Sequence, residues 1–233
     1  STRATNLAVA IGMNATLNAQ ITATTSSGTI ILESKPGQQA VTLTESLTAF
    51  DPGASDGQAN IIALQNLYSG TGPTGLCGVN PTVKWAYNAT TLTNGRVNTS
   101  PVLSLDGTMV AFTESNGTAS VFHVLKWKDL DGSVTVPTTP TTATDISTCT
   151  APCMVSLSYG ASGNTNSSVY YDYSGNDTAF VANDAGRLFK ITGVFTGTPA
   201  LVTTGGWSAS GVAIAGASVV MTSPVLDYAG RIF

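Results

Sequence analysis

The chain has 233 residues and a net charge of −4, with charged side chains at 9% of positions and hydrophobic ones at 42%. This hydrophobic share excludes an intrinsically disordered chain, and the scattered basic residues, which form no basic stripe, argue against nucleic acid as a partner. No run of about 18 apolar residues is present, so we expect no membrane span.

The first 56 residues predict a small α/β module that differs from the rest of the chain. Apolar residues at helical spacing predict an amphipathic helix over residues 3–13. Alternating stretches bounded by turn residues predict strands over 19–24, 29–33 and 40–44. A turn-rich segment follows, and there we place the boundary between domains 1–56 and 57–233.

Three segments of this module resemble a unit found in phage tail and bacterial surface proteins. They read ATNLAVAI at residues 4–11, ITAT at 21–24 and VTLTESLTAF at 41–50. In those proteins the unit is an architectural insert, so the resemblance implies a structural role without chemistry.

A short phrase recurs in the second domain. Ser-Pro-Val-Leu begins at Ser100 and again at Ser223, and a looser copy begins at Ser168. Each copy is an apolar run, a turn with glycine and a second apolar run, which predicts a β-hairpin repeated along the chain. The strands expected in this domain are 60–67, 82–87, 101–104, 109–114, 119–126, 169–172, 178–182, 187–191 and 200–204. A Thr/Pro-rich insertion at about 129–152 has the composition of a surface loop.

The hairpins of this domain resemble those of β-propellers. Residues 179–191 are similar to the hairpin of quinoprotein-like repeats, and 100–112 to that of related propellers. From about residue 58 onward the chain is similar to secreted bacterial propeller proteins with quinoprotein-like or YVTN-like repeats. The resemblance implies a mainly β fold, a partial propeller of about two and a half blades, and an extracellular or cell-surface location. A closed propeller has about four to eight blades, so we expect other subunits or the rest of a longer chain to complete it.

Two of the three cysteines stand close together in the sequence. Cys149 and Cys153 enclose Thr-Ala-Pro, and a short loop with proline can hold them at bridging distance. We therefore expect a disulfide and an oxidising compartment, with two free thiols as the alternative. Cys77 is left without a partner in the sequence.

The sequence offers little that indicates catalysis. His123 is the sole histidine and lies in an alternating strand. A catalytic histidine needs a nucleophile or a carboxylate as a partner, and the sequence indicates none, so we expect a structural role. Asp129 and Asp131, followed by glycine, have the spacing of a calcium loop, but the distal acidic ligand is missing, which favours a simple turn. The three tryptophans are too dispersed to predict a stacked cofactor, so we expect no catalytic residue, metal or cofactor.

These features predict an extracellular structural or interaction protein that is not an enzyme. It would be a scaffold or subunit of a cell-surface assembly, joined by edge-strand pairing with other subunits. A propeller module that binds glycans or peptides is the first alternative. The second is a fragment of a propeller enzyme whose active site lies elsewhere.

Overall fold

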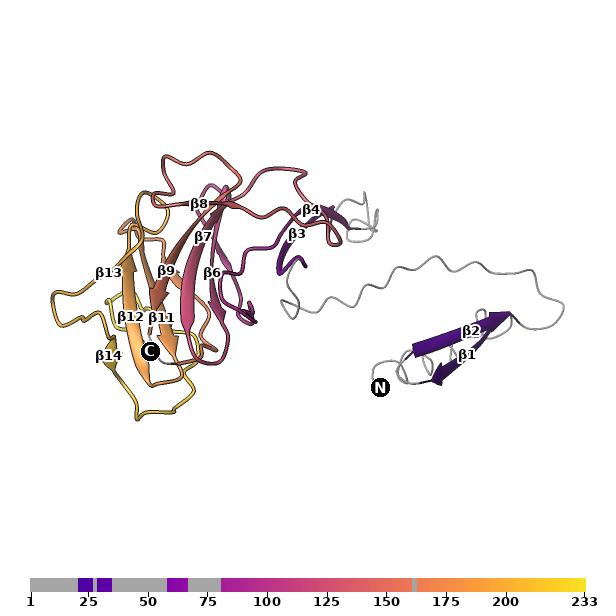
Figure 1. Cartoon of the computed structure of the whole chain (residues 1–233). Helices are drawn as coiled ribbons and strands as arrows, with labels where there is room; N and C mark the ends of the chain where they lie inside the picture. Colours follow the sequence, from indigo (N-terminus) through magenta and orange to yellow (C-terminus); the bar gives the residue numbers. More distant parts are fainter. Residues whose placement is uncertain (1–20, 27–28, 35–57, 67–80, 161–162) are drawn as a thin grey trace. The chain divides into compact units, whose positions relative to one another are not determined.

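A computed structural model describes residues 21–26, 29–34, 58–66, 81–160 and 163–233 (Figure 1). The chain divides into two units, Ser1–Thr48 and Ala49–Phe233, which we describe separately.

The first unit contains an antiparallel hairpin. Strand β1 (Ile21–Ser26) pairs with β2 (Thr29–Ser34) in a register that runs from Ile21 opposite Ser34 to Ser26 opposite Thr29. Both strands are rich in Thr and Ile, which fit the pleated surface of a strand. The hairpin confirms two predicted strands, whereas the predicted helix 3–13 and strand 40–44 lie outside the described residues.

The described part of the second unit is mainly β and holds three sheets (Figure 1). The first sheet pairs β3 (Ile61–Gln65) with β4 (Thr82–Tyr87). The second has the order β5 (Val102–Leu103), β6 (Met109–Ser115), β7 (Ser120–Lys126), β9 (Cys153–Tyr159), β8 (Thr141–Ala143). The third has the order β10 (Tyr170–Asp172), β11 (Thr178–Asn183), β12 (Arg187–Thr192), β13 (Ala200–Leu201), and β14 (Val212–Ala213) also pairs with β12.

The central strands of the second and third sheets are buried on both faces. Nearly every residue of β6, β7 and β11 is buried, because apolar side chains alternate between two separate cores. Phe122 and Val124 pack with Val181 and Ile191 in the core between the second and third sheets. The opposite face of the second sheet packs on β3 and β4, and segments near the C-terminus cover the far face of the third sheet.

The three predicted hairpins are present at their expected places. The first joins β5 to β6, the second joins β10 to β11, and the third closes on a bridge between Leu226 and Ile232. Each turn contains a glycine with positive φ, at 71° for Gly107, 104° for Gly175 and 78° for Gly230. Glycine adopts this left-handed conformation without steric cost, so the repeat in the sequence corresponds to a repeated turn in the structure.

Consecutive hairpins are joined by one recurring contact. The backbone N–H of Ser100 donates to Oγ of Ser168 at 3.0 Å, and the N–H of Ser168 donates to Oγ of Ser223 at 2.9 Å. These are the first residues of the three copies of the phrase, so the repeat in the sequence is also a repeat of tertiary contact.

Two expectations from the sequence need correction. The segment 129–152 is not only a surface loop, because it contributes β8, which pairs in parallel with β9, and its Ile146 is fully buried. Strands β9 and β14 were not predicted from the sequence. The described strands form open sheets and no closed one, so the propeller itself stays a prediction.

Candidate functional site

Three polar side chains meet on one face of the second sheet, on neighbouring strands β6, β7 and β9. His123 of β7 lies directly opposite Phe112 of β6 on one side and Ser156 of β9 on the other. Glu114 is two residues beyond Phe112 and therefore on the same face of β6. Antiparallel pairing thus brings together residues that lie as far apart in the chain as Glu114 and Ser156.

The three side chains form a continuous hydrogen-bonded series. His123 Nε2 lies 2.8 Å from Glu114 Oε2, and His123 Nδ1 lies 2.9 Å from Ser156 Oγ. The side chains of His123 and Glu114 are fully buried, whereas Ser156 is exposed to solvent. The series therefore runs from a buried carboxylate through a buried imidazole to a hydroxyl at the surface.

Glu114 is held in place by a loop from the preceding sheet. Its carboxylate accepts hydrogen bonds from the backbone N–H groups of Thr91 and Leu92 and from the Thr91 hydroxyl, at 2.8 to 3.0 Å. A Cβ at Gly95 would collide with this carboxylate. Burial pushes the pKa of Glu114 upward, but the hydrogen bond and charge of His123 and the two N–H groups outweigh it, so the pKa lies below its usual value.

This arrangement assigns the protons on the imidazole. The N–H groups of Thr91 and Leu92 can only donate, so an ionised Glu114 accepts from them and also from His123. In neutral His123, Nε2 then carries the hydrogen and Nδ1 has a free lone pair, which accepts from the Ser156 hydroxyl. The order of hydroxyl, imidazole and carboxylate is that of a nucleophile, a base and an orienting acid.

No partner for His123 was predicted from the sequence, and the structure supplies Glu114 and Ser156. The sequence did hold a sign that Glu114 needs a partner. Strict alternation along β6 places its carboxylate on the same face as Val110 and Phe112, and a lone charge buried on an apolar face is unfavourable. Ser156 could not be recognised as a partner from alternation along β6, because it lies in β9, which was not predicted as a strand.

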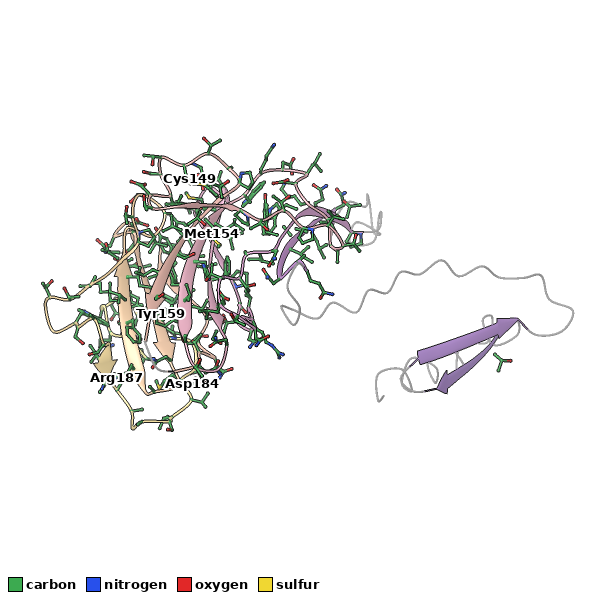
Figure 2. All side chains as sticks on the ribbon, viewed as in Figure 1. Cys149, Met154, Tyr159, Asp184 and Arg187 are labelled. Atoms are coloured by element: carbon green, nitrogen blue, oxygen red, sulfur yellow. A yellow bond between two sulfur atoms is a disulfide. The ribbon has the colours of Figure 1, made fainter. Side chains whose placement is uncertain are left out.

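The described cysteines that were singled out from the sequence are partners of each other. Cys149 and Cys153 are joined in a disulfide with a Cα–Cα distance of 6.3 Å, and Cys77 lies outside the described residues. Figure 2 marks the bridge at one end of β9 and Tyr159 at the other.

The two aspartates of the possible calcium loop are engaged within the protein. Asp129 forms an ion pair with Lys84 at 2.7 Å, and Asp131 accepts hydrogen bonds from Tyr87 and Thr138. In the described part of the chain, no three His, Cys, Asp or Glu residues gather in a way that could hold a metal ion.

Two tryptophans that seemed dispersed in the sequence lie together. The rings of Trp85 and Trp127 stack with centroids 6.1 Å apart, and Trp207 packs instead on Phe180. Both arrangements contribute to the packing between layers of sheet.

Two hollows are relevant to ligands. A pocket of about 480 Å³ lies between the second and third hairpins, where its lining includes Tyr170, Tyr173, Asp172 and Tyr228. A smaller hollow of about 180 Å³ lies at one end of β7 and β9, and Val121 and Ser158 line it. These two residues form the cross-strand pair next to His123 and Ser156 on the same face.

Comparison with known proteins gives no match to a protein-family model, a curated protein or a solved structure. Within the residues that the structure describes, no helix is long and apolar enough to cross a membrane.

Proposed function

We propose that this chain is an extracellular structural or interaction protein, a scaffold or subunit of a surface assembly joined through its third hairpin, residues 225–233. The observation that carries the proposal is the serine contact that recurs between consecutive hairpins, from Ser100 to Ser168 and from Ser168 to Ser223. In repeat architectures each unit contacts its neighbour through the same kind of interface. We infer that the third hairpin contacts a further β-unit in the same way, from another subunit or from the rest of a longer chain.

The side chains of this hairpin suit a protein partner. Tyr228 is fully exposed, Phe233 is 75% exposed and Val225 is 56% exposed. The backbones of Val225 and Phe233 hold each other through two hydrogen bonds of 2.9 Å, which keeps the segment extended. An extended segment with exposed apolar side chains is a favourable template for strand addition.

The layered sheets support the finer proposal that they are propeller blades. Strands β5, β6, β7 and β9 run antiparallel in chain order and pack face to face with the third sheet, as neighbouring blades do. The disulfide and the low share of charged residues favour an extracellular setting.

The proposal is tested by the mass of this 233-residue chain in solution. Light scattering across a range of concentrations should give multiples of its 23.7 kDa mass. Tyr228→Asp should weaken this association, because it places a charge in the interface. Val136→Asp, at a position that is 73% exposed but lies in the 129–152 segment, serves as the matched control. A monomer at every concentration, or equal effects of the two variants, would contradict the proposal.

Binding of glycans or peptides is the second candidate function. The pocket between the second and third hairpins favours it, because exposed tyrosine rings beside carboxylate and amide groups suit a polyhydroxylated ligand. Its volume falls in the usual range of small-ligand sites. An array of glycans and peptides probed with the wild-type chain distinguishes this function from assembly alone.

A further inference from the structure

We propose that Ser156, His123 and Glu114 form an acyl-transfer site that hydrolyses small carboxylic esters. Ser156 is the nucleophile, His123 is the general base and Glu114 is the positioning residue. This activity goes beyond the proposed assembly function and does not depend on it. It also departs from the expectation that the chain is not an enzyme.

The distances meet the requirements of the chemistry. A nucleophile and its base need about 2.6–3.2 Å between heavy atoms, and Ser156 Oγ lies 2.9 Å from His123 Nδ1. The base needs an orienting group on its other nitrogen, and Glu114 lies 2.8 Å from Nε2. Only the hydroxyl end of the series is exposed, so a substrate can reach Ser156 while the base and the acid stay away from water.

The positioning residue is fixed before any substrate arrives. Glu114 is held by Thr91 and Leu92, and its surroundings leave no room for a side chain at Gly95. A carboxylate that cannot move keeps the imidazole in one tautomer and one orientation, which is how preorganisation lowers the barrier. Interior strands carry both the nucleophile and the base, and such elements hold a site more rigidly than loops do.

The neighbouring hollow indicates the class of substrate. Val121 and Ser158 lie two residues along their strands from His123 and Ser156, about 7 Å away on the same face. The hollow they line, of about 180 Å³, is also bordered by Leu92, Ala119 and Ala209. Such a small and largely apolar space suits a short acyl chain, so we infer esters of short carboxylic acids.

The reaction follows in two balanced steps. The Ser156 Oγ attacks the ester carbonyl carbon while its proton passes to His123 Nδ1. The bond to the leaving oxygen then breaks, and the alcohol departs with that proton. Water attacks the acyl-serine in the second step and gives its proton to Nδ1. The bond from Oγ to carbon breaks, Oγ regains the proton and the carboxylic acid is released.

The experiment uses p-nitrophenyl acetate as substrate and a fluorophosphonate as a covalent probe of the serine. In the wild-type chain, mass spectrometry should locate the adduct on Ser156. Ser156→Ala should remove the adduct and lower the hydrolysis rate on the order of 100-fold. This variant is expected to fold, because it changes one exposed hydroxyl.

Two other serines make the comparison specific. Ser158→Ala removes the neighbouring hydroxyl on the same face of β9, and it should keep the adduct on Ser156. Ser174→Ala changes an exposed serine in the second hairpin and should leave the rate unchanged. An adduct absent from Ser156, or equal rates for Ser156→Ala and Ser174→Ala, would overturn the proposal and leave a purely structural hydrogen-bonded series.

Glu114 is tested by a separate readout. Glu114→Gln should lower kcat on the ester with KM unchanged, because the carboxylate acts through His123 and never touches substrate. A change in KM alone would count against its positioning role. The serine comparison stands independently if this variant folds poorly.

Discussion

At the scale of single residues, the buried carboxylate of Glu114 links the second sheet to the loop that precedes it through hydrogen bonds. A buried carboxylate is unfavourable unless donors surround it, and here the imidazole of His123, the backbone of Thr91 and the backbone of Leu92 supply them. Because these donors lower its pKa, Glu114 stabilises the fold at pH values above the unfolded pKa of about 4.5. That stability is lost as the pH falls through the lower, folded pKa.

We therefore predict a pH-dependent effect of Glu114→Gln. At pH 7 the variant should lose about 3 kcal/mol of unfolding free energy. The NH₂ group of glutamine can only donate, and it would face the N–H groups that now donate to the carboxylate. The difference from wild type should shrink as the pH falls below about 4.5. Urea unfolding at several pH values measures it. Asp129→Asn, at an exposed carboxylate that forms a surface ion pair with Lys84, is the control and should change little. A difference that does not depend on pH would contradict this account.

At the scale of elements, glycines in the turns are required for two different reasons. Some have a positive φ that other residues adopt only with strain, and some also lie where an added Cβ would collide with neighbouring atoms. Gly107 and Gly186 both have positive φ, at 71° and 69°. A Cβ at Gly107 would meet nothing within 4 Å, whereas one at Gly186 would come within 2.6 Å of the carbonyl oxygens of Ala215 and Gly216. Gly186 also accepts hydrogen bonds from Ile214 and Ala215, which holds the segment after β14.

The two glycines therefore make a matched pair. Gly107→Ala should cost about 1–2 kcal/mol, the price of the left-handed conformation alone. Gly186→Ala should cost about 1–3 kcal/mol more, because crowding is added to the backbone strain. Thermal unfolding of both variants measures the difference. Equal losses would mean that the contact of the β11–β12 turn with residues 214–216 contributes nothing to stability.

At the scale of the whole molecule, the described sheets of the second unit are stacked in layers that share cores, and burial in these cores stabilises that unit. The largest of these cores lies between the second and third sheets and includes Cys153, against which the loop with Cys149 packs. The disulfide between these residues fastens the 129–152 segment to β9 at the edge of that core.

Reduction of the disulfide should loosen this segment. Loop-closure entropy for so short a loop predicts a loss of about 2 kcal/mol. A reductant should therefore lower the Tm of the wild-type chain and leave the Tm of the Cys149→Ser, Cys153→Ser double variant unchanged. If the wild type does not respond either, the bridge adds no stability in solution.

Much of the local structure was readable from the sequence because its signals are local. Alternating apolar residues predicted β6, β7, β11 and β12, and glycine-containing turns predicted the three hairpins. The short spacing of Cys149 and Cys153 likewise predicted the bridge. Strand β9 was missed although residues 155–159 alternate between apolar side chains and serine as a half-buried strand does, because it directly follows a Thr/Pro-rich segment whose composition indicates a loop.

By itself, the sequence determined a mainly β chain with repeated hairpins and a pair of bridged cysteines. Each of these follows from neighbouring residues, whose spacing sets the backbone conformation. Only the tertiary structure decided the series of Glu114, His123 and Ser156, and the serine contacts between hairpins. Those contacts join residues that are distant in the chain. The register that brings them together is set because the central strands must bury the side chains of both their faces.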